Sequence, residues 1–199
     1  DTEIAGGKAL SDQEMQALGE RFSAHAFRGR VFHIENPVDE RFFSVQEPSA
    51  DPTILYVGRV IPRKGLLELL RSFALVRGDF PAAQLRIAGE TDAAPEYVAA
   101  CRQFLADNHL DKSVSFLGSL TMDQVIEEYR GCGFVALPSL QATSPVAVAE
   151  ALAAGRAVAT NRVCGMPYLV EDGQSGLLLD YGDTEGWAAA LHRLLADSE

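Results

Sequence analysis

The stretch LPSLQATSPVAVAEALAAG at residues 137–155 indicates how the rest of this chain folds. It begins at the end of a short apolar run, residues 134–137, that predicts a buried strand. After a polar turn, Ser144 suits a helix N-cap and Pro145 suits the first helical position. Gly155 suits the left-handed residue that ends a helix. A strand that leads straight into a capped helix directs free amides toward one point beyond the sheet edge, and such a point attracts phosphate.

Glu150 lies about one and a half turns along the same predicted helix. Its carboxylate is too deep in the helix to hold a phosphate at the helix N-terminus, and it is better placed to accept hydrogen bonds from sugar hydroxyls. A solvated residue on the helix surface is the alternative interpretation. The stretch alone leaves both interpretations open.

Six short apolar runs alternate with helical patterns from Thr53 onward. The predicted strands cover residues 53–57, 85–88, 114–117, 134–137, 157–160 and 176–179. This alternation predicts an α/β fold, a Rossmann-like parallel sheet with helices on both faces. Ligands of such sheets bind beyond the carboxyl ends of the strands. Before this region, a capping box at residues 11–14 predicts a helix ending near residue 26, and residues 30–34 suit a strand.

The composition excludes several classes of partner. The chain has 199 residues with 47% apolar and 23% charged residues, enough for one well-buried domain or one domain with an appendage. Its net charge of −11 argues against a nucleic acid or an anionic membrane surface as the main partner. No apolar run reaches membrane-spanning length, so we expect no transmembrane segment. Any phosphate site must therefore be a local cluster of cations and amides.

The three cysteines, Cys101, Cys132 and Cys164, are widely spaced and form no CxxC pair. This spacing indicates neither a zinc site nor a disulfide framework, and it favours a reducing, cytoplasmic setting. Cys164 follows a predicted strand without a nearby base, so we expect it to be a packed thiol. Trp187 and the phenylalanines occur at core spacing and need no ligand.

The loop after the first predicted strand of the alternating region carries two cations. Arg59 and Lys64 flank a segment that Pro62 stiffens and Gly65 closes. A guanidinium fork and a movable ammonium could together hold a diphosphate, whereas a solvated basic loop is the alternative. GxxxxGK[ST] and GxGxxG are both absent, so NTPase and dinucleotide dehydrogenase interpretations lose their main support. Asp-x-Asp is absent too, and without a metal the charge of a departing diphosphate would be stabilised by Arg59, Lys64 and the helix-end amides.

In the order in which they occur, the motifs of this chain resemble those of the C-terminal, donor-binding domain of a GT-B glycosyltransferase. The resemblance is closest to the family 4 retaining enzymes, the glycosyl transferases of group 1, and it runs from about residue 34 to residue 195. Its markers are Asn36-Pro37-Val38-Asp39, Tyr56-Val57-Gly58-Arg59 with Lys64-Gly65, Phe116-Leu117-Gly118, Leu137-Pro138-Ser139, Glu150-Ala151-Leu152-Ala153-Ala154-Gly155, and Leu169-Val170-Glu171-Asp172-Gly173 with Ser175-Gly176-Leu177.

This resemblance implies transfer of a sugar from a nucleotide diphosphate sugar to an acceptor hydroxyl, with retention, without a metal and without a further cofactor. It implies that Arg59 and Lys64 bind the donor diphosphate and that Glu150 accepts the ribose hydroxyls. The other implied contacts are the base with the backbone of Phe116, Leu117 and Gly118, and phosphate or sugar with the amides near Thr143, Ser144 and Val146.

One position departs from the family pattern. The family usually has two glutamates separated by seven residues, and the first contacts the donor sugar. Counting back from Glu150 places that position at Ala142, which can neither accept a hydrogen bond from a hydroxyl nor stabilise positive charge. The sugar contact is therefore missing, is made by a neighbour such as Gln141, or was removed by design. No catalytic residue is assigned.

GT-B enzymes carry the acceptor site on an N-terminal domain, and the sequence before residue 36 is too short to form one. We therefore expect residues 1–40 to be a remnant or linker to a missing acceptor domain, and residues 41–199 to be the donor-binding domain. The acceptor would be a glycan, a lipid or a small molecule. We expect a cytoplasmic protein, with peripheral attachment at the inner membrane through the missing domain as an alternative.

Three hypotheses for the parent protein follow. The first is a glycosyltransferase whose isolated donor half binds nucleotide weakly and transfers nothing. The second is a non-catalytic nucleotide-binding or regulatory module, which Ala142 favours. The third is another GT-B relative, such as a phosphorylase or a sugar-nucleotide epimerase, which the motif order disfavours.

Overall fold

The computed structural model describes residues 36–45, 52–141 and 145–197. The helix and strand predicted before residue 36 lie outside the described residues, as do Ala142, Thr143 and Ser144. The chain divides into two units after Asn36, and the fold below is that of residues 37–199.

The elements of this unit follow the predicted alternation of strands and helices. In chain order they are the 3₁₀ helix η1 (Glu40–Ser44), β1 (Thr53–Val57), the 3₁₀ helix η2 (Pro62–Lys64), α2 (Leu66–Val76), β2 (Gln84–Ala88), α3 (Pro95–Asp107), β3 (Val114–Gly118), α4 (Met122–Gly131), β4 (Phe134–Leu137), α5 (Val146–Ala153), β5 (Ala157–Asn161), α6 (Met166–Leu169), β6 (Gly176–Leu179) and α7 (Thr184–Ala196).

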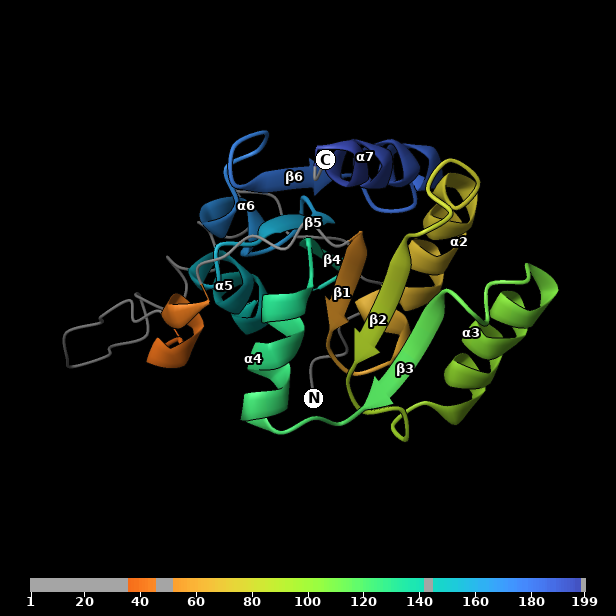
Figure 1. The fold of residues 1–199 in the computed structure, drawn as a ribbon, viewed down its shortest axis with the longest axis horizontal. Helices are drawn as coiled ribbons and strands as arrows, with labels where there is room; N and C mark the ends of the chain where they lie inside the picture. Colours follow the sequence, from red (N-terminus) through yellow and green to blue (C-terminus); the bar gives the residue numbers. More distant parts are fainter. Residues whose placement is uncertain (1–35, 46–51, 142–144, 198–199) are drawn as a thin grey trace, which may run out of the picture. The chain divides into compact units, whose positions relative to one another are not determined.

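The six strands form one sheet in the order β3-β2-β1-β4-β5-β6, and every neighbouring pair is parallel (Figure 1). The predicted Rossmann-like α/β fold is confirmed. Successive strands add outward from β1 to β3, and the chain then returns to the other side of β1 at β4. In sheets of this kind the ligand crevice lies where the strand order reverses, here between β1 and β4.

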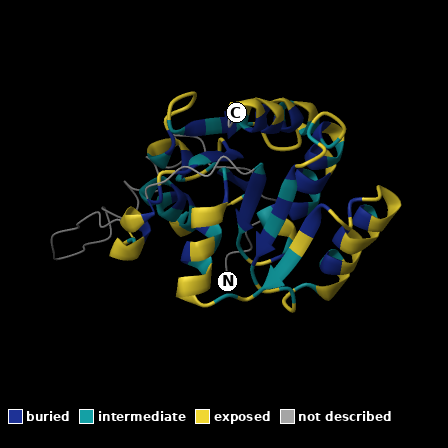
Figure 2. Ribbon diagram, in the orientation of Figure 1, coloured by how far each residue is buried: buried dark blue, intermediate teal, exposed yellow. Residues whose placement is uncertain are grey.

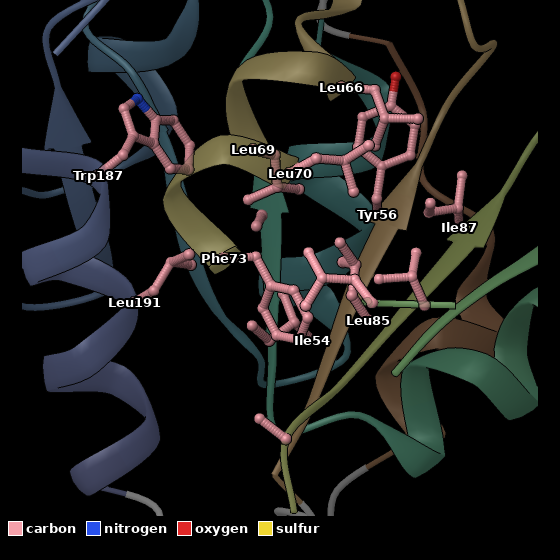
Figure 3. Close-up of a cluster of buried hydrophobic side chains, with 14 of the residues drawn as sticks. Ile54, Tyr56, Leu66, Leu69, Leu70, Phe73, Leu85, Ile87, Trp187 and Leu191 are labelled. Atoms are coloured by element: carbon pink, nitrogen blue, oxygen red, sulfur yellow. The ribbon is translucent and has the colours of Figure 1, made fainter. Parts of the chain in front are cut away.

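Helices cover both faces of the sheet and divide the core into two clusters. One cluster joins the sheet to α2, α3 and α7, and the other joins it to η1, α4, α5 and α6. In the first cluster, Leu70 and Phe73 of α2 lie among the side chains of β1 and β2, and Leu191 of α7 belongs to the same cluster (Figure 3). Burying each such side chain contributes roughly 1.5–3 kcal/mol, so this layer stabilises the sheet.

Burial is deepest in the middle of the sheet. All four residues of β4 are buried, whereas β3 at the edge has one buried residue out of five. The outer faces of the helices are exposed (Figure 2). Strands buried on both faces are the reason that β1 and β4 are continuous apolar runs in the sequence. Trp187 is buried in the core, as its spacing predicts.

The ends of α5 agree in part with the predicted caps. Pro145 is the N-cap residue and not the first helical residue, because its ψ of 77° lies outside the helical range. Its carbonyl already accepts hydrogen bonds from the amides of Val148 and Ala149. Gly155 has a φ of +68°, as predicted for the residue that ends the helix. The amide after it, of Arg156, donates to Ala151 at 2.8 Å and closes the last turn.

Candidate functional site

A cavity of about 370 Å³ lies beyond the carboxyl ends of β1 and β4, at the point where the strand order reverses. Its described walls come from three places: residues 57–59, 63 and 64 after β1, residues 137, 139, 145–148 and 150 from the end of β4 into α5, and Met166 at the start of α6. The size is within the range of sites that hold small molecules. The parallel sheet therefore places the segments that follow β1 and β4 around one cavity.

The segment after β1 forms a basic wall made of Arg59, Arg63 and Lys64. Within the described residues, Arg59 and Arg63 are the two arginines whose side chains make no hydrogen bond, ion pair or cation–π contact. The other described arginines all have such a contact: Arg41, Arg71, Arg77, Arg86, Arg102, Arg130, Arg156, Arg162 and Arg193. In a chain of net charge −11, this wall is a local excess of positive charge.

The pKa of Lys64 shows the effect of this clustering. Burial lowers the pKa of the ammonium from its usual 10.5, and the nearby charges of Arg63 and Arg59 lower it further. The folded chain therefore holds the protonated lysine at a free-energy cost. A bound anion would relieve that cost, because it would supply the missing opposite charge.

Two backbone contacts fix the basic wall against the loop after β4. The amide of Leu140 donates to the carbonyl of Arg63 at 2.9 Å. Gly65 has a φ of +72°, and a Cβ on it would lie 2.2 Å from the carbonyl oxygen of Pro138. Any side chain at residue 65 would thus force the two loops apart.

The N-terminal end of α5 forms the facing wall. Val146 and Ala147 line the cavity. Their amides belong to the first turn, and in the described part of the chain they have no hydrogen-bond acceptor. Free amides and the positive end of the helix dipole suit an anion. Of the three residues predicted to offer amides here, Val146 lies at the cavity, whereas Thr143 and Ser144 are outside the described residues.

Glu150 lies deeper on the same wall and is half-buried. Its Oε2 lies 3.3 Å from the hydroxyl of Tyr129, which comes from α4. Burial raises the pKa of Glu150 above its usual 4.5; the hydrogen bond from Tyr129 opposes this shift and the nearby Asp39 adds to it. Glu150 lines the same cavity as Arg59 and Lys64 and is not fully exposed, which disfavours the interpretation as a solvated residue of the outer helix surface.

The residues predicted to contact a base lie apart from this cavity. Phe116, Leu117 and Gly118 end β3 at the sheet edge and are not among the described lining residues. The Phe116 ring packs under the guanidinium of Arg102, whose Cζ is 4.4 Å from the ring centroid. The Gly118 carbonyl accepts a hydrogen bond from Gly89 at 2.8 Å, which ties the ends of β3 and β2 together. The base contact stays a prediction.

Several cavity residues were not predicted from the sequence. Arg63 was overlooked although it adjoins Lys64. Ser139 belongs to one of the markers of the family resemblance but was given no role, and Met166 has no local signal beyond following a strand. The prediction for Cys164 was wrong, because this thiol is exposed and not packed. It sits in a tight turn with a φ of 50°, which directs the backbone from β5 toward α6.

Two features are absent from the described residues. They contain no group of three or more His, Cys, Asp and Glu residues arranged to bind a metal ion. None of their helices combines the length and the apolar character that a membrane crossing requires.

Comparison with known proteins identifies the family. The family model for the glycosyl transferases group 1 matches residues 51–197. The D-inositol 3-phosphate glycosyltransferase of Corynebacterium jeikeium is 29% identical over 95% of this chain, which covers 48% of that relative. The chain thus spans about half the length of this curated relative. It belongs to the group 1 glycosyl transferases, and the predicted resemblance is confirmed.

Solved structures agree on the fold. The C-terminal domain of LpcC, a group 1 glycosyl transferase of Francisella tularensis, has a TM-score of 0.68 at 22% identity, with 84% of this chain and 87% of that chain covered. HepE of Anabaena, in complex with UDP, has a TM-score of 0.74 at 21% identity, with 94% and 53% covered. The described fold is therefore that of GT-B glycosyltransferase domains.

Proposed function

We propose that this chain is the donor-binding half of a glycosyltransferase that transfers a sugar from a nucleotide diphosphate sugar to an acceptor hydroxyl. One observation carries the proposal: three cations without counter-charges among the described residues and one half-buried carboxylate line the same cavity. A nucleoside diphosphate offers a partner to both groups. Its phosphates suit Arg59, Arg63 and Lys64, and its ribose hydroxyls suit Glu150.

The comparisons support this proposal. HepE, which shares the fold, was solved with UDP. The curated relatives are named as glycosyltransferases that act on D-inositol 3-phosphate, and a transferase of this group needs an activated sugar donor. The chain spans about half of the first relative, so the acceptor in the names of these relatives is no part of the proposal.

The proposed reaction is a hexosyl transfer with retention. The bond between the anomeric carbon and the diphosphate oxygen breaks, the acceptor oxygen bonds to that carbon, and the hydroxyl proton of the acceptor leaves with the nucleoside diphosphate. Negative charge then grows on the leaving phosphate oxygen. Arg59, Lys64 and the first amides of α5 would stabilise that charge, since they are already in place before the reaction. This arrangement would serve in place of a metal ion, in a sequence that has no Asp-x-Asp motif.

A second domain completes the proposed enzyme. We propose that it binds the glycan, lipid or small-molecule acceptor and that the 199-residue chain by itself transfers nothing. Incubation of the chain with UDP-glucose and GDP-mannose, with release of UDP or GDP as the readout, tests this point. Steady turnover by the isolated chain would contradict it.

Calorimetric titration of the chain with UDP, GDP, ADP and inorganic pyrophosphate tests donor binding. We expect at least one nucleoside diphosphate to bind, and Arg59→Ala to weaken it by roughly 10- to 100-fold, the range for hydrogen bonds to charged groups. Arg193→Ala is the matched control, because it removes an arginine from an exposed ion pair on α7. The proposal fails if no nucleoside diphosphate binds, or if the two variants weaken binding equally.

A non-catalytic nucleotide-binding or regulatory module is the second candidate. Ala142 favours it, since the family usually has a glutamate that contacts the donor sugar at this position. The protein that contains both domains distinguishes the two candidates when it is assayed with and without Ala142→Glu. Activity that requires the substitution supports the binding module, whereas activity without it supports the enzyme.

A further inference from the structure

The side chain of Tyr129 links α4 to the wall of the cavity. Tyr129 has no exposed surface, yet its hydroxyl lies 3.1 Å from the carbonyl oxygen of Ala147 and 3.3 Å from Oε2 of Glu150, both on α5. The site as described above uses the Glu150 carboxylate and leaves this phenol without a role. The hydroxyl is nevertheless the one described side-chain partner of that carboxylate.

Tyr129 is itself held firmly. The Phe42 ring packs edge-on against the tyrosine ring, with centroids 5.3 Å apart. The Tyr129 carbonyl accepts a hydrogen bond from Nε of Arg156 at 2.8 Å, and Nη2 of the same guanidinium donates to Arg130 at 3.2 Å. The buried Arg156 therefore caps the last turn of α4, where positive charge is favourable. Ring and backbone together fix the position of the phenolic oxygen.

The phenol has one proton and faces two acceptors. When Glu150 is ionised, the proton can be given to the carboxylate or to the Ala147 carbonyl. When Glu150 is protonated, the carboxyl group can donate to the phenol oxygen while the phenol donates to Ala147. Oε2 is occupied by Tyr129 when the phenol donates to the ionised carboxylate and when the protonated carboxyl group donates to the phenol. The other oxygen, Oε1, is left for a ligand.

We propose that Tyr129 is a positioning residue that holds the Glu150 carboxylate for the ribose diol of the donor and thereby makes the site prefer ribonucleotides to deoxyribonucleotides. The proposal rests on the proposed function, because it presumes that a nucleoside diphosphate occupies the cavity. A freely rotating carboxylate would lose side-chain entropy when it binds a hydroxyl, whereas one that is already oriented loses less.

Other charged groups near Glu150 determine how its pH dependence is interpreted. Asp39, before η1, raises the pKa of Glu150, and the described titratable groups across the cavity are Arg59, Arg63 and Lys64. The elements η1 and α6, which pack against α5, add Glu40, Arg41 and the exposed Tyr168. All of these groups stay unchanged in Tyr129→Phe. A shift in the acid limb of nucleotide binding, which is the pH range over which binding is lost on acidification, therefore reports on the lost hydrogen bond.

The experiment compares UDP, GDP and ADP with their 2′-deoxy and 3′-deoxy forms by calorimetry. We expect the wild-type chain to bind one ribonucleotide roughly 10- to 100-fold more tightly than a deoxy form, the ratio for lost hydrogen bonds to a charged acceptor. Tyr129→Phe should reduce that ratio by about threefold or more, the net effect of one hydrogen bond. The affinity of Tyr129→Phe for inorganic pyrophosphate should stay within about twofold of the wild-type affinity, as expected when the substituted residue is distant from the phosphate site and independent of it.

Tyr97→Phe is the matched control, because it removes a phenol that accepts a hydrogen bond from Leu67 on the other face of the sheet. If Tyr129→Phe fails to fold, Glu150→Gln is the second variant to measure, and it must reduce the ribose preference. In Tyr129→Phe, binding should be lost at a higher pH on acidification, since the ionised carboxylate has lost a donor.

The outcomes separate this inference from the proposed function. An unchanged ribose preference and an unchanged acid limb in a folded Tyr129→Phe would overturn the role of Tyr129, while nucleoside diphosphate binding by the wild type would still support the proposed function. A wild-type chain that binds no nucleoside diphosphate would overturn both.

Discussion

On the basic wall of the cavity, Arg59, Arg63 and Lys64 have no counter-charge among the described residues, whereas on the α5 wall Glu150 has its own hydrogen-bond donor in Tyr129. The difference reflects what each wall would contact. A cation that already had a protein carboxylate as a partner would have to release it before it could bind a phosphate. A carboxylate that accepts hydroxyl hydrogens keeps a free oxygen when a phenol occupies the other one.

The two walls are also held in place by different means. Backbone contacts at Gly65 and Leu140 position the basic wall, and its cationic side chains have no ion pair among the described residues. A side-chain hydrogen bond positions the carboxylate of the α5 wall. Substitutions on each wall should therefore fail in different ways, and three of them test this comparison.

Gly65→Ala should have the largest effect, on the geometry of the basic wall. The new Cβ would lie 2.2 Å from the Pro138 oxygen at a φ of +72°, so we expect a loss of about 2 kcal/mol or more in the free energy of unfolding. Urea denaturation measures this loss. Gly182→Ala is the control, because its φ is +80° and nothing lies within 4 Å of the new Cβ. This variant therefore measures only the cost of placing alanine in the left-handed backbone conformation. Equal losses would show that the contact with Pro138 is unimportant.

Lys64→Met should separate binding from stability. We expect pyrophosphate affinity to fall by roughly tenfold or more, because a cation that contacts phosphate is lost. The ligand-free chain should become slightly more stable near neutral pH, because the folded state lowers the pKa of Lys64 and so disfavours its charge. Lys112→Met, at an exposed residue, should change neither quantity. A loss of stability in Lys64→Met would mean that the ammonium has a favourable partner.

Glu150→Gln should give the smallest effect, a pH-dependent gain in stability. The folded pKa of Glu150 lies above its usual 4.5, so its contribution to stability is largest below that pH and is lost as the pH rises through the folded pKa. Glutamine avoids the cost of the buried charge, so the variant should melt at a higher temperature near neutral pH and match the wild type below about pH 4. Glu127→Gln, which removes an exposed carboxylate, should show no such gain. A gain that persisted in acid would point to a cause other than ionisation.

Most of the fold could be predicted from the sequence, because its signals are local. The strands at residues 53–57 and 134–137 end where predicted, since each is an apolar run followed by glycine or proline. Residues 121–124 have the sequence of a capping box, and both hydrogen bonds of that box, between Thr121 and Gln124, are present. The cap of α5 was predicted with an error of one residue, because Pro145 suits both the N-cap and the first helical position.

The candidate site could be predicted in part. Arg59, Lys64 and Glu150 were named from residue type and from their place after strands, and the fold gathers them around one cavity. Arg63 was missed because its neighbour already supplied the expected charge. The role of Tyr129 could not be seen, since it lies 21 residues before Glu150 and on a different helix.

By itself, the sequence determined which segments are strands and helices, where basic and acidic side chains follow strands, and the family to which the chain belongs. These features depend on hydrophobic periodicity and caps, which act over a few residues. Only the tertiary structure decided that the segments after β1 and β4 enclose one cavity, that Gly65 touches Pro138 and that a buried phenol reaches the α5 carboxylate. Those contacts join residues far apart in the chain, and they exist because the strand order brings β4 beside β1 and not beside β3.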